Sequence, residues 1–282
     1  MPTPSSHLLL LGCGQLAKEL IRQEKDSDKP RRITATTRNP LRIFELVELG
    51  IEPLILPLPH AEIIEPLAAG SDVVVTFPPD EHTDSVLSPA CAAARTITYI
   101  SSTSVYGKKM GTIDDTTPAD IPNESCRPRL EAESIWREYG AVVLRAPGFY
   151  SPGNGLHKRL KDGTYKLPDG GTNTSSRIHL TDLARIILHV IEREQLEDTT
   201  YVVGDKYPCT QLEIVTWLCE QMQLPMPQSV PMEEVNPTLR GNRAIQANRI
   251  LEELNMELSY PNYKDGYLQC LSAAQLDLQD ND

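Results

Sequence analysis

The 282-residue chain lacks several features that would place it in a class at once. It has no uncharged apolar stretch near the roughly 20 residues that cross a bilayer. Its first residues carry neither the basic region nor the apolar core of a secretion signal. There is no long run of Lys and Arg, and the net charge is −12. Because an acidic chain repels phosphate backbones and anionic lipid, we expect neither nucleic acid nor a membrane as its partner.

Several catalytic and metal-binding motifs are also missing. The six cysteines form no Cys-x-x-Cys pair, which disfavours a zinc ribbon or a redox pair and suits reduced thiols in a cytoplasm. Neither Gly-x-Ser-x-Gly, a Gly-Lys-Ser/Thr phosphate loop nor His-Glu-x-x-His occurs. The acidic segment 80–84 holds one histidine but no second His or Cys at ligand spacing, so no metal is expected.

Short apolar runs alternate with amphipathic stretches over the first 105 residues, the pattern of a parallel sheet covered by helices on both faces. Strands are expected at 7–11, 33–37, 53–58, 72–77, 96–101, 141–146 and 200–203. Helices are expected at 12–23, 39–49, 84–94, 129–139, 178–192, 212–222 and 244–254.

The segment 147–176 is rich in Gly, Ser and Pro and marks a lobe boundary. We therefore predict an α/β protein with a doubly wound parallel sheet of the Rossmann type and a small C-terminal substrate lobe. The dinucleotide-binding domain is predicted at 1–150 and the substrate lobe at 151–282, with 177–204 returning to the sheet.

A glycine motif follows the first expected strand and opens the first helix. Gly12-Cys-Gly14-Gln-Leu-Ala17 fits G-x-G-x-x-G/A, in which the first glycine makes the tight turn, the second lets the backbone approach a pyrophosphate, and Ala17 allows close packing. A purely structural turn is the alternative. The residues predicted to hold a dinucleotide here and at the carboxyl ends of the next strands are Gly12, Gly14, Gln15, Leu16, Ala17, Thr37, Arg38, Thr76, Phe77 and Pro78.

In NAD-binding proteins with this motif, an Asp or Glu about 20 residues after the glycines holds the ribose. This chain has neither residue there. The second strand ends in Thr36-Thr37-Arg38, and a guanidinium binds phosphate through charge-assisted hydrogen bonds. We therefore predict that the cofactor is NADP(H), and NAD remains the alternative. A solvated charge on the loop is the alternative role for Arg38.

Three segments resemble the extended short-chain dehydrogenase/reductase superfamily, in its atypical branch near the NAD(P)-dependent epimerase/dehydratase group. They are Tyr99-Ile-Ser-Ser-Thr-Ser-Val-Tyr-Gly107, Leu144-Arg-Ala-Pro-Gly-Phe-Tyr150 and Arg177-Ile-His-Leu-Thr-Asp-Leu183. The resemblance implies that Ser102 orients a substrate, and that the segment holding Pro147 and Tyr150 lines a nicotinamide.

The chain departs from that family at its Tyr-x-x-x-Lys pair. Aligned on the helix that carries this pair, Arg129 stands at the lysine and Ser125 at the tyrosine. An arginine stays protonated, so Arg129 can position an anion but cannot shuttle a proton. The Tyr-x-x-x-Lys that starts at Tyr260 contains a proline, and we interpret it as a loop.

From these residues we predict an NADP(H)-binding oxidoreductase or epimerase-like enzyme acting on a small sugar-like or carbonyl substrate, with Ser102, Ser125, Arg129 and Tyr150 as its catalytic candidates. A non-enzymatic dinucleotide sensor or scaffold is the alternative. An anionic substrate is expected because segment 151–180 carries five basic and two acidic residues; the alternative is that its basic residues are solvated on a mobile loop. A homo-oligomer is compatible with the sequence.

Overall fold

The computed structural model describes residues 7–193 and 195–279. The chain forms two compact units, and each unit is built from three stretches of sequence. Unit 1 comprises Met1–Val105, Glu124–Arg145 and Ala184–Tyr201, and unit 2 comprises Tyr106–Asn123, Ala146–Leu183 and Val202–Asp282. Within the described ranges, no helix is both long and apolar enough to cross a membrane.

A seven-stranded sheet organises unit 1, in the order β12-β7-β5-β4-β1-β2-β3. The strand pairs β1–β2, β1–β4, β2–β3 and β4–β5 are all parallel. This confirms the predicted doubly wound α/β sheet. The strands are β1 (His7–Leu11), β2 (Arg32–Thr37), β3 (Glu52–Ile55), β4 (Asp72–Val75), β5 (Thr96–Ser102), β7 (Val142–Ala146) and β12 (Thr200–Val202).

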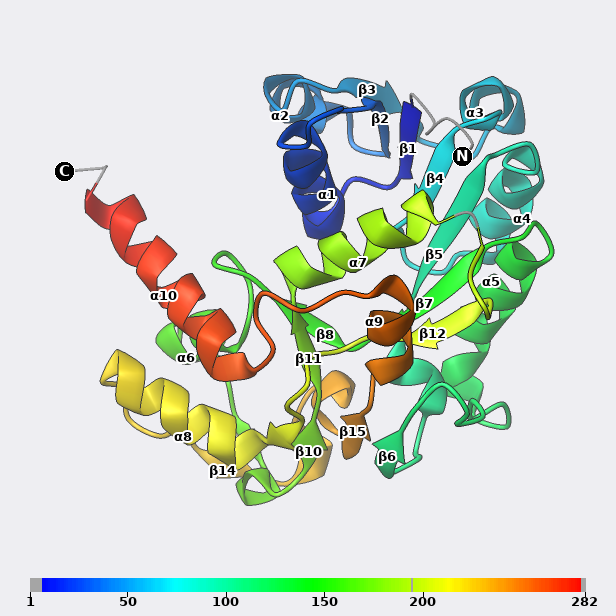
Figure 1. Cartoon of the computed structure of the whole chain (residues 1–282). Coiled ribbons are helices and arrows are strands. Elements are labelled where there is room, and N and C mark those ends of the chain that lie inside the picture. The colour runs from blue at the N-terminus through cyan, green and yellow to red at the C-terminus, as the bar shows by residue number, and fades with distance from the viewer. Residues whose placement is uncertain (1–6, 194, 280–282) are drawn as a thin grey trace. The chain divides into compact units, whose positions relative to one another are not determined.

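Helices cover both faces of this sheet, with α1 and α7 along one face and α4 and α5 along the other (Figure 1). Strands β1 and β4 are buried at every residue, which explains why their sequences are apolar runs rather than alternating patterns. The helical elements are α1 (Gln15–Lys25), the 3-10 helix η1 (Pro40–Arg42), α2 (Ile43–Glu48), α3 (Ala61–Ala68), α4 (Glu81–Ala90), α5 (Arg127–Arg137) and α7 (Leu180–Glu192).

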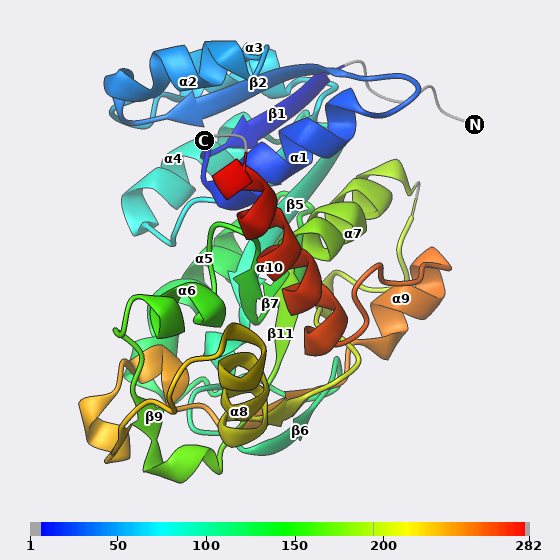
Figure 2. The same cartoon turned by 90° about the vertical axis from the view of Figure 1, so that its left-hand side faces the viewer.

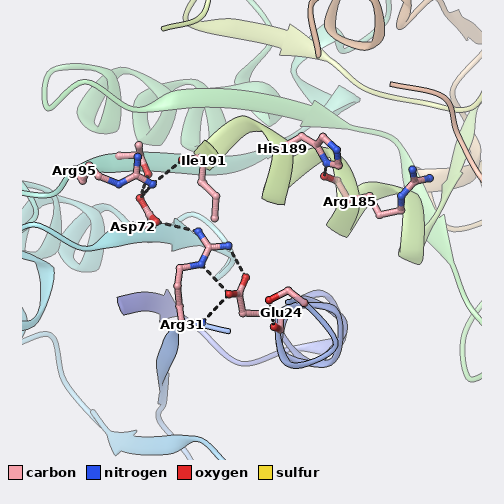
Figure 3. A network of polar contacts seen from close by, with 9 residues as sticks. Glu24, Arg31, Asp72, Arg95, Arg185, His189 and Ile191 are labelled. Atoms are coloured by element: carbon pink, nitrogen blue, oxygen red, sulfur yellow. Dashed lines mark hydrogen bonds and ion pairs between the residues drawn. The ribbon is translucent and has the colours of Figure 1, made fainter. Parts of the chain in front are cut away.

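Four charged side chains form a buried network at the amino ends of the strands (Figure 3). Arg31 binds Glu24 and places Nη1 3.0 Å from Asp72 Oδ2, and Arg95 binds Asp72 and the carbonyl of Ile191. Burial lowers the pKa of Arg31, but the carboxylates of Glu24 and Asp72 outweigh it and raise that pKa above its usual value. The network ties α1, β4 and the loop before β2 together.

Unit 2 contains short two-stranded sheets and helices around an aromatic core. The core cluster includes Tyr150, Tyr165, Tyr263 and Tyr267, packed against residues of α6, α8 and α10. Figures 1 and 2 both show these three helices gathered on one side of the unit. The elements are β6 (Gly111–Ile113), β8 (Gly148–Tyr150), α6 (Leu156–Lys161), β9 (Leu167–Pro168), β10 (Thr174–Ser175), β11 (Arg177–His179), β13 (Cys209–Thr210), α8 (Gln211–Met222), β14 (Ser229–Val230), β15 (Arg243–Ile245), α9 (Asn248–Leu254) and α10 (Tyr263–Gln279).

Two predicted helices begin later than the sequence pattern indicated. The stretch predicted at 178–192 starts as strand β11, which pairs with β8, before α7 begins at Leu180. The stretch predicted at 244–254 starts as strand β15, which pairs with β6. In both cases, pairing with a strand distant in sequence overrides local helix propensity.

The buried network predicts different costs for two neighbouring arginines. Arg31→Leu should lower the free energy of unfolding by about 3–5 kcal/mol, because it leaves buried carboxylates without their partner. Arg32→Leu removes an exposed pair with Glu52 at 3.6 Å and should cost less than about 1 kcal/mol. Urea denaturation of both variants measures the difference, and equal costs would contradict the role of Arg31.

Candidate dinucleotide pocket

Unit 1 contains a cavity of about 490 Å³ where strands β1, β2 and β4 end. Of the residues predicted to hold a dinucleotide, the structure places seven on the wall of this cavity: Gly12, Gly14, Thr37, Arg38, Thr76, Phe77 and Pro78. Gln15, Leu16 and Ala17 form the first turn of α1 behind the glycine loop, where Leu16 and Ala17 are buried. Pro147 belongs to unit 2.

The glycine loop lines this pocket, and its neighbours leave no room for a side chain at residue 12. Gly12 has φ = +97°, and a Cβ there would lie 3.0 Å from Thr76 Oγ1 and 3.1 Å from the Phe77 nitrogen. The Gly12 N–H donates to Thr36 Oγ1 at 2.7 Å, and Thr76 Oγ1 donates to the Gly12 carbonyl at 3.1 Å. The ends of three strands are therefore joined at one glycine.

The amino end of α1 is open toward an anion. Gly14 is its N-cap, no side chain caps the helix, and no acidic residue lies in its first turn. A Cβ built on Gly14 would meet no atom within 4 Å. Free N–H groups at a helix start beside open space suit a pyrophosphate, so the loop fits a dinucleotide.

Two arginines line the pocket next to the end of β2. Arg38 is exposed and makes no hydrogen bond or ion pair with any other described residue. Arg42 donates to the Cys13 carbonyl and, through Nε, to Glu45 Oε2 at 3.0 Å. Hydrogen bonds from Lys18 and Arg42 lower the pKa of Glu45, which keeps it ionised.

Sequence reasoning missed Arg42. The signal was a second arginine close to Arg38 in sequence, in the short helix that the Asn-Pro pair starts. Across the pocket, Asp80 accepts a hydrogen bond from the Thr83 N–H, and this contact, assisted by the charge of Arg38, lowers the Asp80 pKa.

The apolar part of the remaining wall is formed by Leu56, Pro57, Leu58, Phe77 and Leu87, and His82 and Thr83 add polar groups to it. A pocket with flat apolar sides, two guanidinium groups and a helix start combines the surfaces needed for a base, a sugar phosphate and a pyrophosphate.

A second group of predicted residues lies around the carboxyl end of β5, also in unit 1. Arg129 on α5 places Nη1 3.3 Å from the Tyr99 hydroxyl and 3.4 Å from the Ile100 carbonyl. Ser102 is half-buried and accepts a hydrogen bond from the Ser104 N–H at 3.1 Å. Ser125 is exposed in the short 3-10 turn before α5.

The tyrosine beside Arg129 stays protonated near neutrality. Burial raises the pKa of Tyr99 to about 12, although the charge of Arg129 opposes the shift. One turn further along α5, Glu133 is fully buried and binds Arg145 with both oxygens, at 3.0 and 2.8 Å. The helix that carries Arg129 is thus fixed to the sheet by a buried bidentate ion pair.

Tyr150 lies in the core of unit 2. Its ring stacks on Tyr267 with centroids 4.3 Å apart, and its hydroxyl has no hydrogen-bond partner among the described residues. Burial raises the pKa of Tyr150 far above its usual value. In this conformation the phenol is a neutral group.

Unit 2 also buries an acid and a base outside the predicted site. Arg177 donates to Cys209 Sγ at 2.9 Å and to Ser175 Oγ at 2.6 Å. Burial raises the pKa of Asp205 to about 7, and the charge of Arg177 opposes part of that shift. Asp205 Oδ2 accepts no hydrogen bond from the described residues.

The described ranges contain no group of three or more His, Cys, Asp or Glu side chains arranged to hold a metal ion.

Comparisons with known proteins identify the fold. No protein-family model and no curated protein matches the chain. A functionally unknown conserved protein from Silicibacter pomeroyi DSS is 29% identical, with a TM-score of 0.79 over 96% of this chain and 98% of its own. A candidate NAD-dependent epimerase/dehydratase from Methylobacillus flagellatus is 22% identical, with a TM-score of 0.75 over 96% and 99%.

A third solved structure is that of UDP-glucuronic acid 4-epimerase from Bacillus cereus in complex with NAD. It is 15% identical, with a TM-score of 0.74 over 94% of this chain and 99% of its own. The chain therefore has the Rossmann-type fold of NAD-dependent epimerases and dehydratases over nearly its whole length. The fold expected from the sequence resemblance is confirmed.

The crowding at residue 12 predicts that the two glycines respond differently to alanine. Gly12→Ala should lower the free energy of unfolding by at least about 1–2 kcal/mol, because it combines a positive φ with contact to Thr76 and Phe77. Gly14 has a negative φ and open space beside it, so Gly14→Ala should change the free energy of unfolding by less than about 1 kcal/mol. Thermal and urea unfolding test this, and equal losses would contradict the assigned geometry.

The buried Asp205 predicts a pH-dependent stability. Its folded pKa of about 7 exceeds the ordinary value of 3.8, so the folded state holds a proton across that window. Its contribution to stability is present at low pH and is lost as the pH rises toward 7, with a slope of at most about 1.4 kcal/mol per pH unit. Asp205→Asn should flatten this slope in denaturation experiments. Asp162→Asn, at an exposed carboxyl, is the control and should retain it, and unchanged slopes in Asp205→Asn would refute the assignment.

Proposed function

We propose that the chain binds NADP(H) in the unit 1 pocket and acts as an oxidoreductase or epimerase-like enzyme of the short-chain dehydrogenase/reductase type. The observation that carries this proposal is the pair of arginines, Arg38 and Arg42, at the end of β2, where a NAD-selective site would present a carboxylate. Arg38 has no partner within the described residues, so its guanidinium is available to a 2′-phosphate.

The glycine loop supports the same assignment. Gly12 shapes the turn, Gly14 leaves the open space, and the first turn of α1 with Gln15, Leu16 and Ala17 supplies N–H groups to a pyrophosphate. Thr37 flanks the ribose end, and Thr76, Phe77 and Pro78 line the opposite wall.

When bound, the nicotinamide would supply hydride transfer. Arg129 would hold an anionic or hydroxyl group at the carboxyl end of β5, because it is permanently charged and oriented by the Ile100 carbonyl. Ser102 and Ser125 would hydrogen-bond the substrate. Tyr150 lies in the core of unit 2, and its neutral phenol would serve there only as a hydrogen-bond donor.

The substrate proposed is a small sugar-like or carbonyl compound with an anionic group. One solved structure with this fold is a UDP-glucuronic acid epimerase, whose substrate combines a sugar with phosphates. Within unit 2, α6 carries Lys158, Arg159 and Lys161 in its last turn. Arg177 contributes to structure instead, because it is buried with Cys209 and Ser175.

One observation favours a non-enzymatic dinucleotide sensor as the second candidate. At the position of the family's Tyr-x-x-x-Lys pair stand Arg129, which is permanently charged, and beside it Tyr99, whose pKa is about 12, and neither of these two groups exchanges protons near neutrality. Such a protein would bind the dinucleotide and respond to its redox state without turnover.

The cofactor proposal predicts that NADPH binds several-fold more tightly than NADH. Arg38→Asp should reverse the preference, because a carboxylate repels the 2′-phosphate and accepts hydrogen bonds from a free ribose. Isothermal titration with both cofactors measures this. Arg193→Asp, at an exposed arginine outside the pocket, is the matched control and should keep the wild-type ratio. Equal affinities in the unmodified chain would refute the NADPH preference.

The role given to Arg129 predicts the effect of removing it. Arg129→Ala should weaken cofactor or substrate binding by about 10-fold or more, since one charge-assisted contact is worth about 1.5–3 kcal/mol. The pH profile of any activity should keep its shape, because a guanidinium does not titrate. If the profile showed an essential base that Arg129→Ala removes and Tyr150→Phe does not, the positioning role would be contradicted.

A further inference from the structure

A carboxylate that lies outside the pocket wall holds one of the two arginines on that wall. Arg42 lines the pocket, whereas Glu45, three residues further along η1 and α2, does not. Glu45 Oε2 accepts a hydrogen bond from Arg42 Nε at 3.0 Å, and Arg42 Nη1 donates to the Cys13 carbonyl in the glycine loop. The guanidinium is therefore fixed at two points, one on the next helix and one on the loop.

These two contacts leave most of the Arg42 guanidinium available to a ligand. An arginine carries five N–H donors, and within the described ranges Arg42 donates two of them, from Nε and Nη1. The other three remain for a phosphate, which a guanidinium binds through paired N–H groups. Arg38 makes no hydrogen bond or ion pair with another described residue, so a ligand must order it on binding. Arg42 is thus the preordered arginine of the pair.

Lys18 offsets the repulsion that a carboxylate would exert on a phosphate nearby. It lies on α1, outside the pocket wall, and forms an ion pair with the other oxygen of Glu45, Oε1. The hydrogen bonds from Lys18 and Arg42 lower the pKa of Glu45, which therefore stays ionised at neutral pH. Two cations and one carboxylate leave the cluster with a net positive charge, which favours an anion in the pocket.

The same cluster contributes little to stability. The side chains of Lys18, Arg42 and Glu45 are 37%, 28% and 41% exposed, and water screens ion pairs at that exposure. Holding long side chains in one geometry also costs rotamer entropy. The main effect of the cluster is therefore on the orientation of Arg42 at the pocket.

We propose that Glu45 is the positioning residue that fixes Arg42 for the selection of NADP(H). This inference rests on the proposed function. Glu45 contacts no ligand and acts through the Arg42 guanidinium, which binds the 2′-phosphate. Because that guanidinium is ordered before the cofactor arrives, less side-chain entropy is lost on binding. NADH lacks the phosphate, so Glu45 affects the affinity for NADPH alone.

Isothermal titration with NADPH and NADH tests the positioning role in two variants of one residue. Glu45→Ala removes the acceptor of the Arg42 Nε–H and should weaken NADPH binding at least about 3-fold, while NADH binding stays unchanged. Glu45→Gln keeps an oxygen acceptor for that N–H and should bind NADPH at least as tightly as wild type. Charge alone predicts tighter NADPH binding in both variants, so tighter binding in Glu45→Ala would overturn the proposal.

The matched control is Glu48→Ala, at an exposed glutamate of the same helix outside the pocket. It should bind both cofactors as wild type does. The midpoint of urea unfolding should be the same in Glu45→Ala and Glu48→Ala, and a fall confined to Glu45→Ala would assign Glu45 to structure instead.

A double-mutant cycle tests whether Glu45 acts through Arg42. In an Arg42→Ala background, Glu45→Ala should not weaken NADPH binding further, and a loss as large as in the unmodified background would overturn the proposal. Equal affinities of the wild-type chain for NADPH and NADH would refute the proposed cofactor preference itself. A wild-type preference for NADPH that Glu45→Ala leaves intact would refute only the role of Glu45.

Discussion

The pocket of unit 1 depends on the absence of a side chain at residue 12. Gly12 adopts φ = +97° at the end of β1, and its N–H and carbonyl groups bind the Thr36 and Thr76 hydroxyls from β2 and β4. These contacts set the separation of three strand ends, and with it the position of the α1 start. The turn also leaves open space beside Gly14, at the start of α1.

Buried ion pairs fix the two ends of the same sheet. Asp72 joins Arg31 and Arg95 at the amino ends of the strands, while Glu133 holds Arg145 near the carboxyl end of β5. Taking such charges out of water costs several kcal/mol each, so they add little net stability. They do penalise any other register, since a slipped strand would leave a buried charge without its partner. The geometry around Arg129 follows from this anchoring.

The sequence predicted what local patterns encode and missed what distant contacts decide. Consecutive residues encode the strand, glycine turn and helix of residues 7–25. The arginine at residue 38, near the position where an Asp or Glu would hold the ribose of NAD, can likewise be recognised from local sequence. Helices α3 and α10 were both missed, and a proline lies inside α3 (Pro66) and just before α10 (Pro261). Strand β11 was read as helix because its partner β8 lies far away in sequence. The Arg42 contact to the Cys13 carbonyl depends on a fold that brings residues 29 apart together.

The buried cysteines divide evenly between the units, with Cys13, Cys91 and Cys126 in unit 1 and Cys209, Cys219 and Cys270 in unit 2. Burial raises the pKa of Cys91 and of Cys270 to about 12, so neither thiol is reactive while its unit stays closed. Alkylation can reach these sulfurs only through local opening. The rate at which Cys91 is alkylated therefore reports how often unit 1 opens, and the rate for Cys270 reports how often unit 2 opens.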